Sequence, residues 1–183
     1  IKGHELESDI LNSTNSIKRQ IFLIQNLINE FSSFARMPKP KIVMLNISEI
    51  LNIYYDEYTK NYNLITFTRD IDNDIFLNFD QSYFDLVLNN LFKNSIEAGK
   101  NTNNFKINIA LKKVDNNIVF HFTDNGPGFD GDIDQLTQPY FSTKNSTGLG
   151  LSLVHKIISD NGAHFKIKTS KDNGFEVSIT FNA

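Results

Sequence analysis

The sequence predicts an α+β fold, in which a mixed sheet carries a layer of helices on one face and a long helix precedes the sheet. Pairs of predicted strands are joined by short turns at "DNN" (115–117) and "KDNG" (171–174), which indicates antiparallel hairpins. A fully parallel sheet would instead show strands and helices in regular alternation. Two stretches, 81–98 and 150–160, have the apolar face of helices that pack on a sheet. Residues 6–36 carry a heptad pattern, which is typical of a coiled coil.

Composition limits the possible functions. The chain has 183 residues, 40% hydrophobic and 21% charged, which is ordinary for a globular domain with an appendage. Its formal charge of −3 gives no indication of a nucleic-acid partner. Cysteine is absent, which excludes disulfides and thiolate or cysteine–zinc sites. No apolar run approaches the ~18 residues that span a bilayer, and the start at Ile1 indicates a piece of a longer protein.

The predicted helix 6–36 has an apolar seam with alternating spacings of four and three. The seam is wide enough to need partner helices in a bundle or dimer, although the helix could instead fold back on its own domain. Pro38 and Pro40 end the helix and place the domain boundary, giving a dimerisation segment at 1–38 and a globular domain at 39–183. The seam residues are Ile10, Thr14, Ile17, Ile21, Ile24, Ile28, Phe31 and Ala35.

The globular part is predicted to begin with a helix over 46–62, capped by either Asn46 or Ser48. A long polar segment, 125–147, is expected to be a functional loop or lid, since structureless loops of that length are uncommon in compact domains. The remaining expected elements are strands at 64–71, 75–80, 104–114, 116–124, 163–170 and 175–181, with helices at 81–98 and 150–160.

The helix 81–98 carries the first candidate site. Asn90, Asn94 and Glu97 share a flank about 100° from the apolar face, which should pack on the sheet. That face consists of Phe84, Val87, Leu88, Leu91, Ser95 and Ala98. Asparagine is a poor residue inside a helix, so two of them beside the core face need a reason. An amide oxygen is a ligand that Mg²⁺ accepts when phosphates and waters fill its other positions. The alternative is a pair of solvated asparagines.

The stretch "DNGPGF", 124–129, ends a predicted strand. The carboxylate of Asp124 could accept a hydrogen bond from an exocyclic amine, while Gly126 and Gly128 would let a flat ligand approach. An ordinary strand-ending turn would use the same residue types.

A third stretch, "PYFSTKNSTGLGLSL", places Gly148 and Gly150 before a helix whose first amides could receive an anion. Lys144 on the preceding loop could close over a phosphate, or could simply be solvated.

Taken in this order, the motifs resemble the ATP-binding domain of sensor histidine kinases, in the group shared with gyrase, Hsp90 and MutL. The "NNLFKN" stretch is similar to the N box, "DNGPG" and "STGLGL" to the two glycine boxes, and "PYFSTK" to the F box. The resemblance implies the Bergerat-type two-layer α/β sandwich, with ATP and Mg²⁺ as ligands. It implies that Asn94 binds the metal, Asn90 its hydration shell or the phosphates, and Asp124 adenine. The remaining implied nucleotide-site residues are Gly126, Gly128, Thr143, Lys144, Thr147, Gly148, Leu149 and Gly150, with Asn90 and Lys144 counted as catalytic.

Asn90 stands where gyrase-like members carry a glutamate that activates water. An amide cannot act as that base, so the sequence favours phosphoryl transfer over ATP hydrolysis. Two other hypotheses stay open here: a non-catalytic ATP-binding module whose nucleotide sets dimer shape, and, with less support, a gyrase-like ATPase.

The stretch "FSSFARMPKP", together with "KNSIEA" and "PYFSTK", is similar to NtrY-type nitrogen-regulation sensor kinases. That resemblance implies a homodimer through the N-terminal helix, an NtrX-like response regulator as partner, and a cytoplasmic position in an inner-membrane sensor. The sequence departs from the pattern at Ser146, where the second glycine box usually begins with glycine, and by one residue fewer between Thr143 and Thr147.

The phosphoacceptor histidine of such a kinase is expected in a stretch like H-E-x-x-N-P-L. His4, in "GHELES", is rejected because no N-P-L follows it and because it lies 36 − 4 = 32 residues before Arg36, too few for a helical hairpin. The other histidines, His121, His155 and His164, lack a neighbour in sequence that would indicate a metal or a base. We therefore expect the acceptor to lie outside these 183 residues.

Overall fold

The computed structural model describes a globular part over residues 39–143, 146–171 and 174–182. Before it, the described residues 11, 13–18, 20–21, 24–25 and 28 are helical, which agrees with the predicted helix as far as they reach. The rest of that helix, His4, Pro38 and Lys144 lie outside the described residues.

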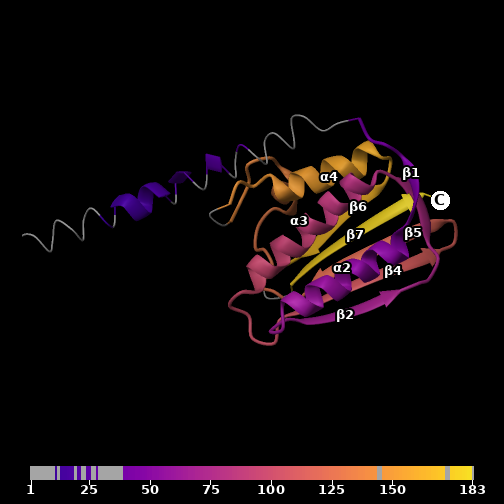
Figure 1. Cartoon of the computed structure of the whole chain (residues 1–183), viewed down its shortest axis with the longest axis horizontal. Coiled ribbons are helices and arrows are strands. Elements are labelled where there is room, and N and C mark those ends of the chain that lie inside the picture. The colour runs from indigo at the N-terminus through magenta and orange to yellow at the C-terminus, as the bar shows by residue number, and fades with distance from the viewer. Residues whose placement is uncertain are drawn as a thin grey trace, which may run out of the picture.

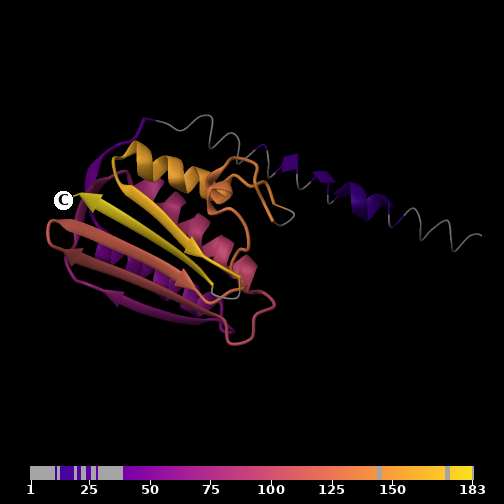
Figure 2. The ribbon, with the colours of Figure 1, turned by 180° about the vertical axis from the view of Figure 1, so that it is seen from behind.

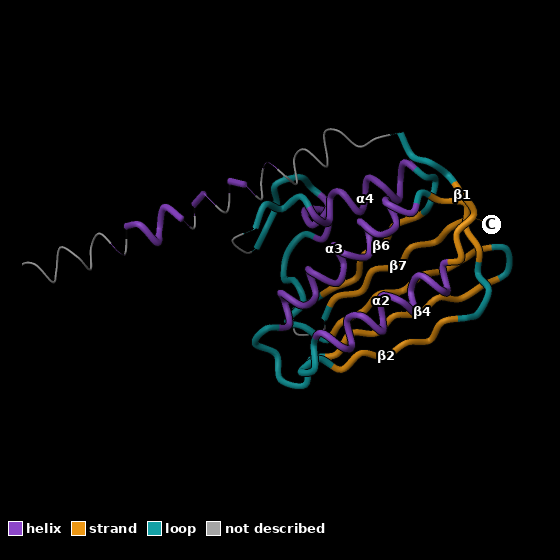
Figure 3. Tube along the Cα trace, viewed as in Figure 1, coloured by secondary structure: helices purple, strands orange, loops and turns teal. Residues whose placement is uncertain are grey.

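A five-stranded mixed sheet forms one layer, with strand order β2-β4-β5-β7-β6. The three helices α2 (Ile47–Asn61), α3 (Gln81–Gly99) and α4 (Gly150–Asp160) cover one face of it (Figures 1 and 3), and the view from behind shows the strands in front of them (Figure 2). This confirms the predicted two-layer sandwich. The strands are β2 (Thr66–Ile71), β4 (Lys106–Val114), β5 (Asn117–Asp124), β6 (His164–Thr169) and β7 (Phe175–Asn182).

Alternating side chains build the core between the two layers. In β4 and β5 every second residue is buried, as expected for a sheet with one covered face. On α3, Phe92 is fully buried, and its ring stacks on Tyr58 of α2 at 4.0 Å and meets Phe122 of β5 edge-on at 5.1 Å. The apolar face predicted for this helix is therefore its core face. Its fully or almost fully buried members are Phe84, Val87, Leu88, Leu91 and Ser95.

Two pairings were not predicted. β1 (Val43–Asn46) was not expected as a strand, and it pairs antiparallel with β3 (Phe76–Phe79) in a separate two-stranded sheet. β2 pairs with β4 in parallel, whereas every other neighbour in the large sheet is antiparallel. The loop 125–147 also contains a short 3-10 helix, η1 (Ile133–Thr137). Other observed bounds lie within one or two residues of those expected.

Side-chain caps explain where two helices begin. Asn46, one of the two expected caps, accepts a hydrogen bond from the amide of Glu49 at 3.2 Å and starts α2. Asp80 accepts from the amide of Tyr83 at 3.0 Å and starts α3. Asp80 is buried and also accepts from the amide of Lys41 at 2.5 Å, so it ties the entry of the domain to α3.

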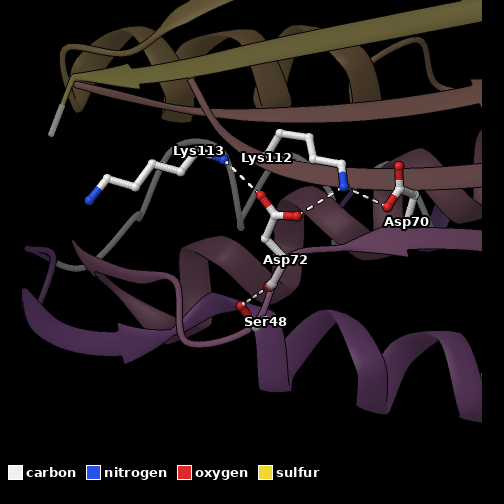
Figure 4. A network of polar contacts seen from close by, with 5 residues as sticks. All are labelled: Ser48, Asp70, Asp72, Lys112 and Lys113. Carbon is white, nitrogen blue, oxygen red and sulfur yellow. Dashed lines mark hydrogen bonds and ion pairs between the residues drawn. The ribbon is translucent and has the colours of Figure 1, made fainter. Parts of the chain in front are cut away.

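Ser48, the other expected cap, has a different role (Figure 4). Its hydroxyl donates to the carbonyl of Asp72 at 2.7 Å and accepts from the amide of Ile75 at 3.0 Å, which fixes α2 to the end of β2. Lys112 of β4 donates to the carboxylates of Asp70 at 2.5 Å and Asp72 at 2.9 Å. The hydrogen bond from Lys112 lowers the pKa of Asp72. These contacts fix the β2–β4 edge, away from the cavity described next.

Candidate functional site: a cavity between α3 and α4

A cavity of about 230 Å³ lies where α3, the end of β5, the loop 125–147 and the start of α4 meet. It is lined by residues from all three motif stretches, which are up to 60 residues apart (Asn90 to Gly150). The cavity therefore unites the three motifs in one place. The predicted residues that line it are Asn90, Asn94, Asp124, Gly128, Thr143, Thr147, Gly148 and Gly150.

Two of the predicted residues that the structure describes, Leu149 and Gly126, are not in the lining. Leu149 is 2% exposed and precedes α4 as its N-cap residue. Gly126 lies behind Asp124 and contacts it through its amide. Lys144 lies outside the described residues, so its predicted place in the lid stays a prediction.

The carboxylate of Asp124 is held by two donors. The amide of Gly126 donates to Oδ1 at 2.9 Å, in the Asx-type geometry that a strand-ending Asp-x-Gly favours. The hydroxyl of Ser95, from α3, donates to Oδ2. Hydrogen bonds to both oxygens fix the plane of the carboxylate, so its orientation at the cavity is set before any ligand arrives.

Gly148 and Gly150, the glycines of the third stretch, lie in close contact with their neighbours. Gly148 has φ +68°, and a Cβ there would lie 2.5 Å from the carbonyl oxygen of Phe141. Gly150 begins α4, where a Cβ would lie 2.6 Å from Oδ1 of Asn90. At Gly148 a Cβ would meet backbone and force the chain apart, whereas at Gly150 the end of the Asn90 side chain would have to move away from the start of α4. The two glycines thus bring the asparagine and the helix N-terminus to the same cavity.

The N-terminus of α4 has no side-chain cap on its first turn. Leu149 occupies the N-cap position, while Gly150 and Leu151, the first two residues of the helix, line the cavity. Amides of a first helical turn lack partners within the helix and, with the macrodipole, favour an anion. This end of the cavity is built to receive negative charge.

The two asparagines are half-buried and not simply solvated, which was the alternative reading. The Nδ2 of Asn90 donates to the carbonyl of Leu86 at 2.7 Å, and this orients Oδ1 toward the start of α4. Among the described residues, no three His, Asp or Glu side chains gather as a metal site. A cation here would therefore depend on amide oxygens together with the oxygens of a bound phosphate.

Sequence reasoning missed several residues of the cavity. Ser95 was assigned to the core face, and its hydroxyl was the available signal, since a buried polar group needs a partner. Lys93 lies one turn after Asn89 on α3 and brings a cation to the lining. The apolar wall consists of Pro127, Phe129, Leu136, Phe141, Leu151 and Phe175, which come from five separate segments.

Comparison with known proteins identifies the domain. The family described as histidine kinase-, DNA gyrase B- and HSP90-like ATPases matches residues 79–183, more than half of the chain. The nitrogen regulation protein NtrY of Azorhizobium caulinodans is 29% identical over 178 residues, covering 93% of this chain and 23% of NtrY. Sporulation kinase B of Bacillus subtilis is 33% identical over 125 residues, covering 67% of this chain and 29% of that protein.

The catalytic domain of histidine kinase ThkA is a close structural neighbour. It has a TM-score of 0.68 at 27% identity, covering 78% of this chain and 95% of that domain. This chain spans only about a quarter of the length of the curated NtrY-like relatives, 23% and 28% for two of them. No described helix is long and apolar enough to cross a bilayer. By its sequence match and its fold, the chain belongs to the family of histidine kinase-, DNA gyrase B- and HSP90-like ATPases.

Proposed function

We propose that this chain is the ATP-binding catalytic part of a two-component sensor histidine kinase. The observation that carries the proposal is the cavity itself, which joins Asn90 and Asn94 of α3, the fixed carboxylate of Asp124 and the uncapped start of α4. The carboxylate suits the amino group of adenine, and the helix amides suit a triphosphate. The apolar residues of the lining suit the flat base.

The proposed reaction is transfer of the γ-phosphoryl group of ATP to a histidine. The bond between the γ-phosphorus and the bridging oxygen breaks, a phosphorus–nitrogen bond to imidazole forms, and ADP leaves. Asn90 supports transfer over hydrolysis, because its amide donates to the Leu86 carbonyl and has no basic atom to activate water. The protein's part is positioning and charge stabilisation. A gyrase-like ATPase is therefore disfavoured, and a non-catalytic ATP-binding module would bind nucleotide without any transfer.

The partners belong to the same proposal. The predicted seam positions Ile17, Ile21, Ile24 and Ile28 are each at least 50% exposed, which supports pairing with helices of a homodimer in the segment 1–38. ThkA has been solved in complex with the response regulator TrrA, and that supports a response regulator, NtrX-like by resemblance, as the final acceptor. On the same resemblance we place the domain on the cytoplasmic side of a membrane-anchored sensor.

The transfer can be tested with the chain and a separate helical hairpin that bears H-E-x-x-N-P-L, taken from an NtrY relative. The chain alone should bind ATP and acquire no label from γ-³²P-ATP, since none of its four histidines lies in an acceptor stretch. Added hairpin should gain weak label that is acid-labile and base-stable, because the proximity of an intact enzyme is missing.

Two results would contradict this layout. Label on His4 of the chain alone would make "GHELES" an acceptor after all. Tight ATP binding by the chain, with no label on a hairpin that another histidine kinase is able to phosphorylate, would favour the non-catalytic module.

Magnesium is the expected companion of ATP, and an amide oxygen with phosphate oxygens and waters suits its octahedral shell. We propose that Asn94 supplies that oxygen. Asn94→Ala should weaken binding of Mg-ATP roughly tenfold, the worth of one good polar contact, and should leave metal-free ATP little changed. Calorimetry with and without Mg²⁺ measures both.

Asn89→Ala is the matched control for this change. Asn89 is on the same helix, outside the cavity lining, with its Nδ2 donating to the hydroxyl of Tyr54 at 3.2 Å. Both ATP forms should bind this variant as they bind the unmodified chain. Equal losses for Mg-ATP and metal-free ATP in Asn94→Ala would remove the metal from the role given to this residue.

A further inference from the structure

Ser95 makes an unusual contact for a serine inside a helix. Such hydroxyls commonly donate back to the carbonyl three or four residues earlier. The hydroxyl of Ser95 leaves its own helix and donates to Oδ2 of Asp124, which is 29 residues later at the end of β5. Ser95 is 2% exposed, yet it belongs to the cavity lining, so its hydroxyl lies at the inner boundary of the cavity.

The contact between Ser95 and Asp124 determines which hydrogen-bonding groups a ligand would meet on the wall of the cavity formed by these two residues. A serine hydroxyl has one hydrogen, and that hydrogen is engaged by Asp124. The amide of Gly126 is likewise engaged by the other carboxylate oxygen at 2.9 Å. These two donors therefore point at the carboxylate, and the atoms of this contact that can face a ligand are acceptors: the carboxylate oxygens and the Ser95 oxygen.

We propose that Ser95 is a positioning residue that makes the cavity selective for a 6-aminopurine over a 6-oxopurine. A 6-amino group donates to such a wall, whereas a 6-oxo group brings another acceptor against it. This inference rests on the proposed nucleotide-binding function and adds its specificity. Ser95 acts through Asp124, by holding the carboxylate in one orientation and by keeping its own hydrogen away from the ligand.

Removal of the hydroxyl should loosen the choice of base without abolishing binding. In Ser95→Ala, Oδ2 of Asp124 loses a donor, and water can take the place of the hydroxyl. A water can reorient and donate to a 6-oxo group, which the serine hydroxyl, engaged with the carboxylate, does not do. Hypoxanthine is the informative base, because it has the same ring system as adenine, with a 6-oxo group in place of the 6-amino group and a hydrogen on N1 where adenine has an acceptor.

The experiment compares the affinities of ADP and IDP for the whole chain by calorimetry. The unmodified chain should prefer ADP by roughly ten- to a hundredfold, the range expected for one hydrogen bond to a charged acceptor. Ser95→Ala should reduce that ratio by about fivefold or more, mostly through weaker ADP binding. Ser95→Thr retains a hydroxyl and should restore most of the ratio.

Ser48→Ala is the matched control. Ser48 is also a buried helical serine, 4% exposed, that donates to a distant residue, the carbonyl of Asp72, outside the cavity lining (Figure 4). Its loss should lower the melting temperature without changing the ADP-to-IDP ratio. The melting curves of all variants separate a general loss of folding from a change in selectivity.

The ADP-to-IDP affinity ratios of the variants decide whether Ser95 sets the choice of base. A lower ratio in Ser95→Ala, restored in Ser95→Thr and unchanged in Ser48→Ala, supports the inference. An unchanged ratio in a folded Ser95→Ala overturns it and leaves the proposed function intact. If the unmodified chain binds neither ADP nor ATP, the proposed function fails and takes the inference with it.

Discussion

Asp124→Asn should bind adenine nucleotides roughly ten- to a hundredfold more weakly than the unmodified chain, the worth of about 1.5–3 kcal/mol for a hydrogen bond to a charged acceptor. The carboxylate now accepts from the Gly126 amide and from the Ser95 hydroxyl. An asparagine has only one carbonyl oxygen, so its NH₂ group replaces either the oxygen that accepts from Gly126, where a donor meets a donor, or the oxygen that accepts from Ser95. In both cases the charged acceptor offered to the ligand is lost.

Asp130→Asn is the charge-matched control. Asp130 is exposed in the same loop and outside the cavity lining, so this variant removes one negative charge without touching the site. Its affinity for ATP, measured by calorimetry, should stay within about twofold of the unmodified chain, as for a surface change. If ATP and GTP compete equally for the unmodified chain, or if Asp124→Asn binds ATP normally, the assignment of Asp124 to adenine is wrong.

Gly128→Ala should lower both stability and nucleotide binding. Gly128 has φ +68°, and a Cβ there would lie 1.9 Å from the carbonyl oxygen of Ser170. The left-handed backbone costs about 1–2 kcal/mol for alanine, and forcing backbone apart costs about 1–3 kcal/mol more. The free energy of unfolding should therefore fall by about 2–5 kcal/mol, and the melting temperature by roughly 10 °C. Because Gly128 lines the cavity, ATP affinity should fall with it.

Gly162→Ala separates the two costs. Gly162 has nearly the same backbone, φ +72°, but a Cβ there would meet nothing within 4 Å. Only the backbone cost of about 1–2 kcal/mol applies, so the melting temperature should fall by a few degrees and ATP affinity should not change. Equal thermal losses in both variants would show that the contact with Ser170 is not the cause.

Local signals account for what could be predicted. The cap at Asn46, the turn between β4 and β5 and the apolar periods of α3 and α4 each act within a few residues along the chain. The need for glycine at Gly128 and Gly148 is also a local property, because the backbone there has positive φ, which glycine adopts most easily. These features were predicted within one or two residues, and residues from all three motif stretches line one cavity.

Long-range pairing explains what was missed. β1 is four residues long, and its partner β3 lies about 30 residues further along, so nothing within "VMLN" itself marks a strand. The parallel pairing of β2 with β4 depends on α3 crossing between them, which no short stretch contains. The apolar wall of the cavity was missed for the same reason, because its members Phe129, Phe141 and Phe175 come together only after the sheet and the loop 125–147 are in place.

The sequence by itself predicted which residues should carry the chemistry: the two asparagines, Asp124 and the glycines before α4. Residue type is enough for that, since an amide, a carboxylate and a missing Cβ each have few uses beside a helix or strand end. Only the tertiary structure decided how these groups are oriented. Ser95 was assigned to the core by its period, and it lies at the cavity because β5 ends beside that turn of α3. A hydrogen bond between residues 29 apart has no local trace in the chain, since its geometry exists only once helix and sheet have packed.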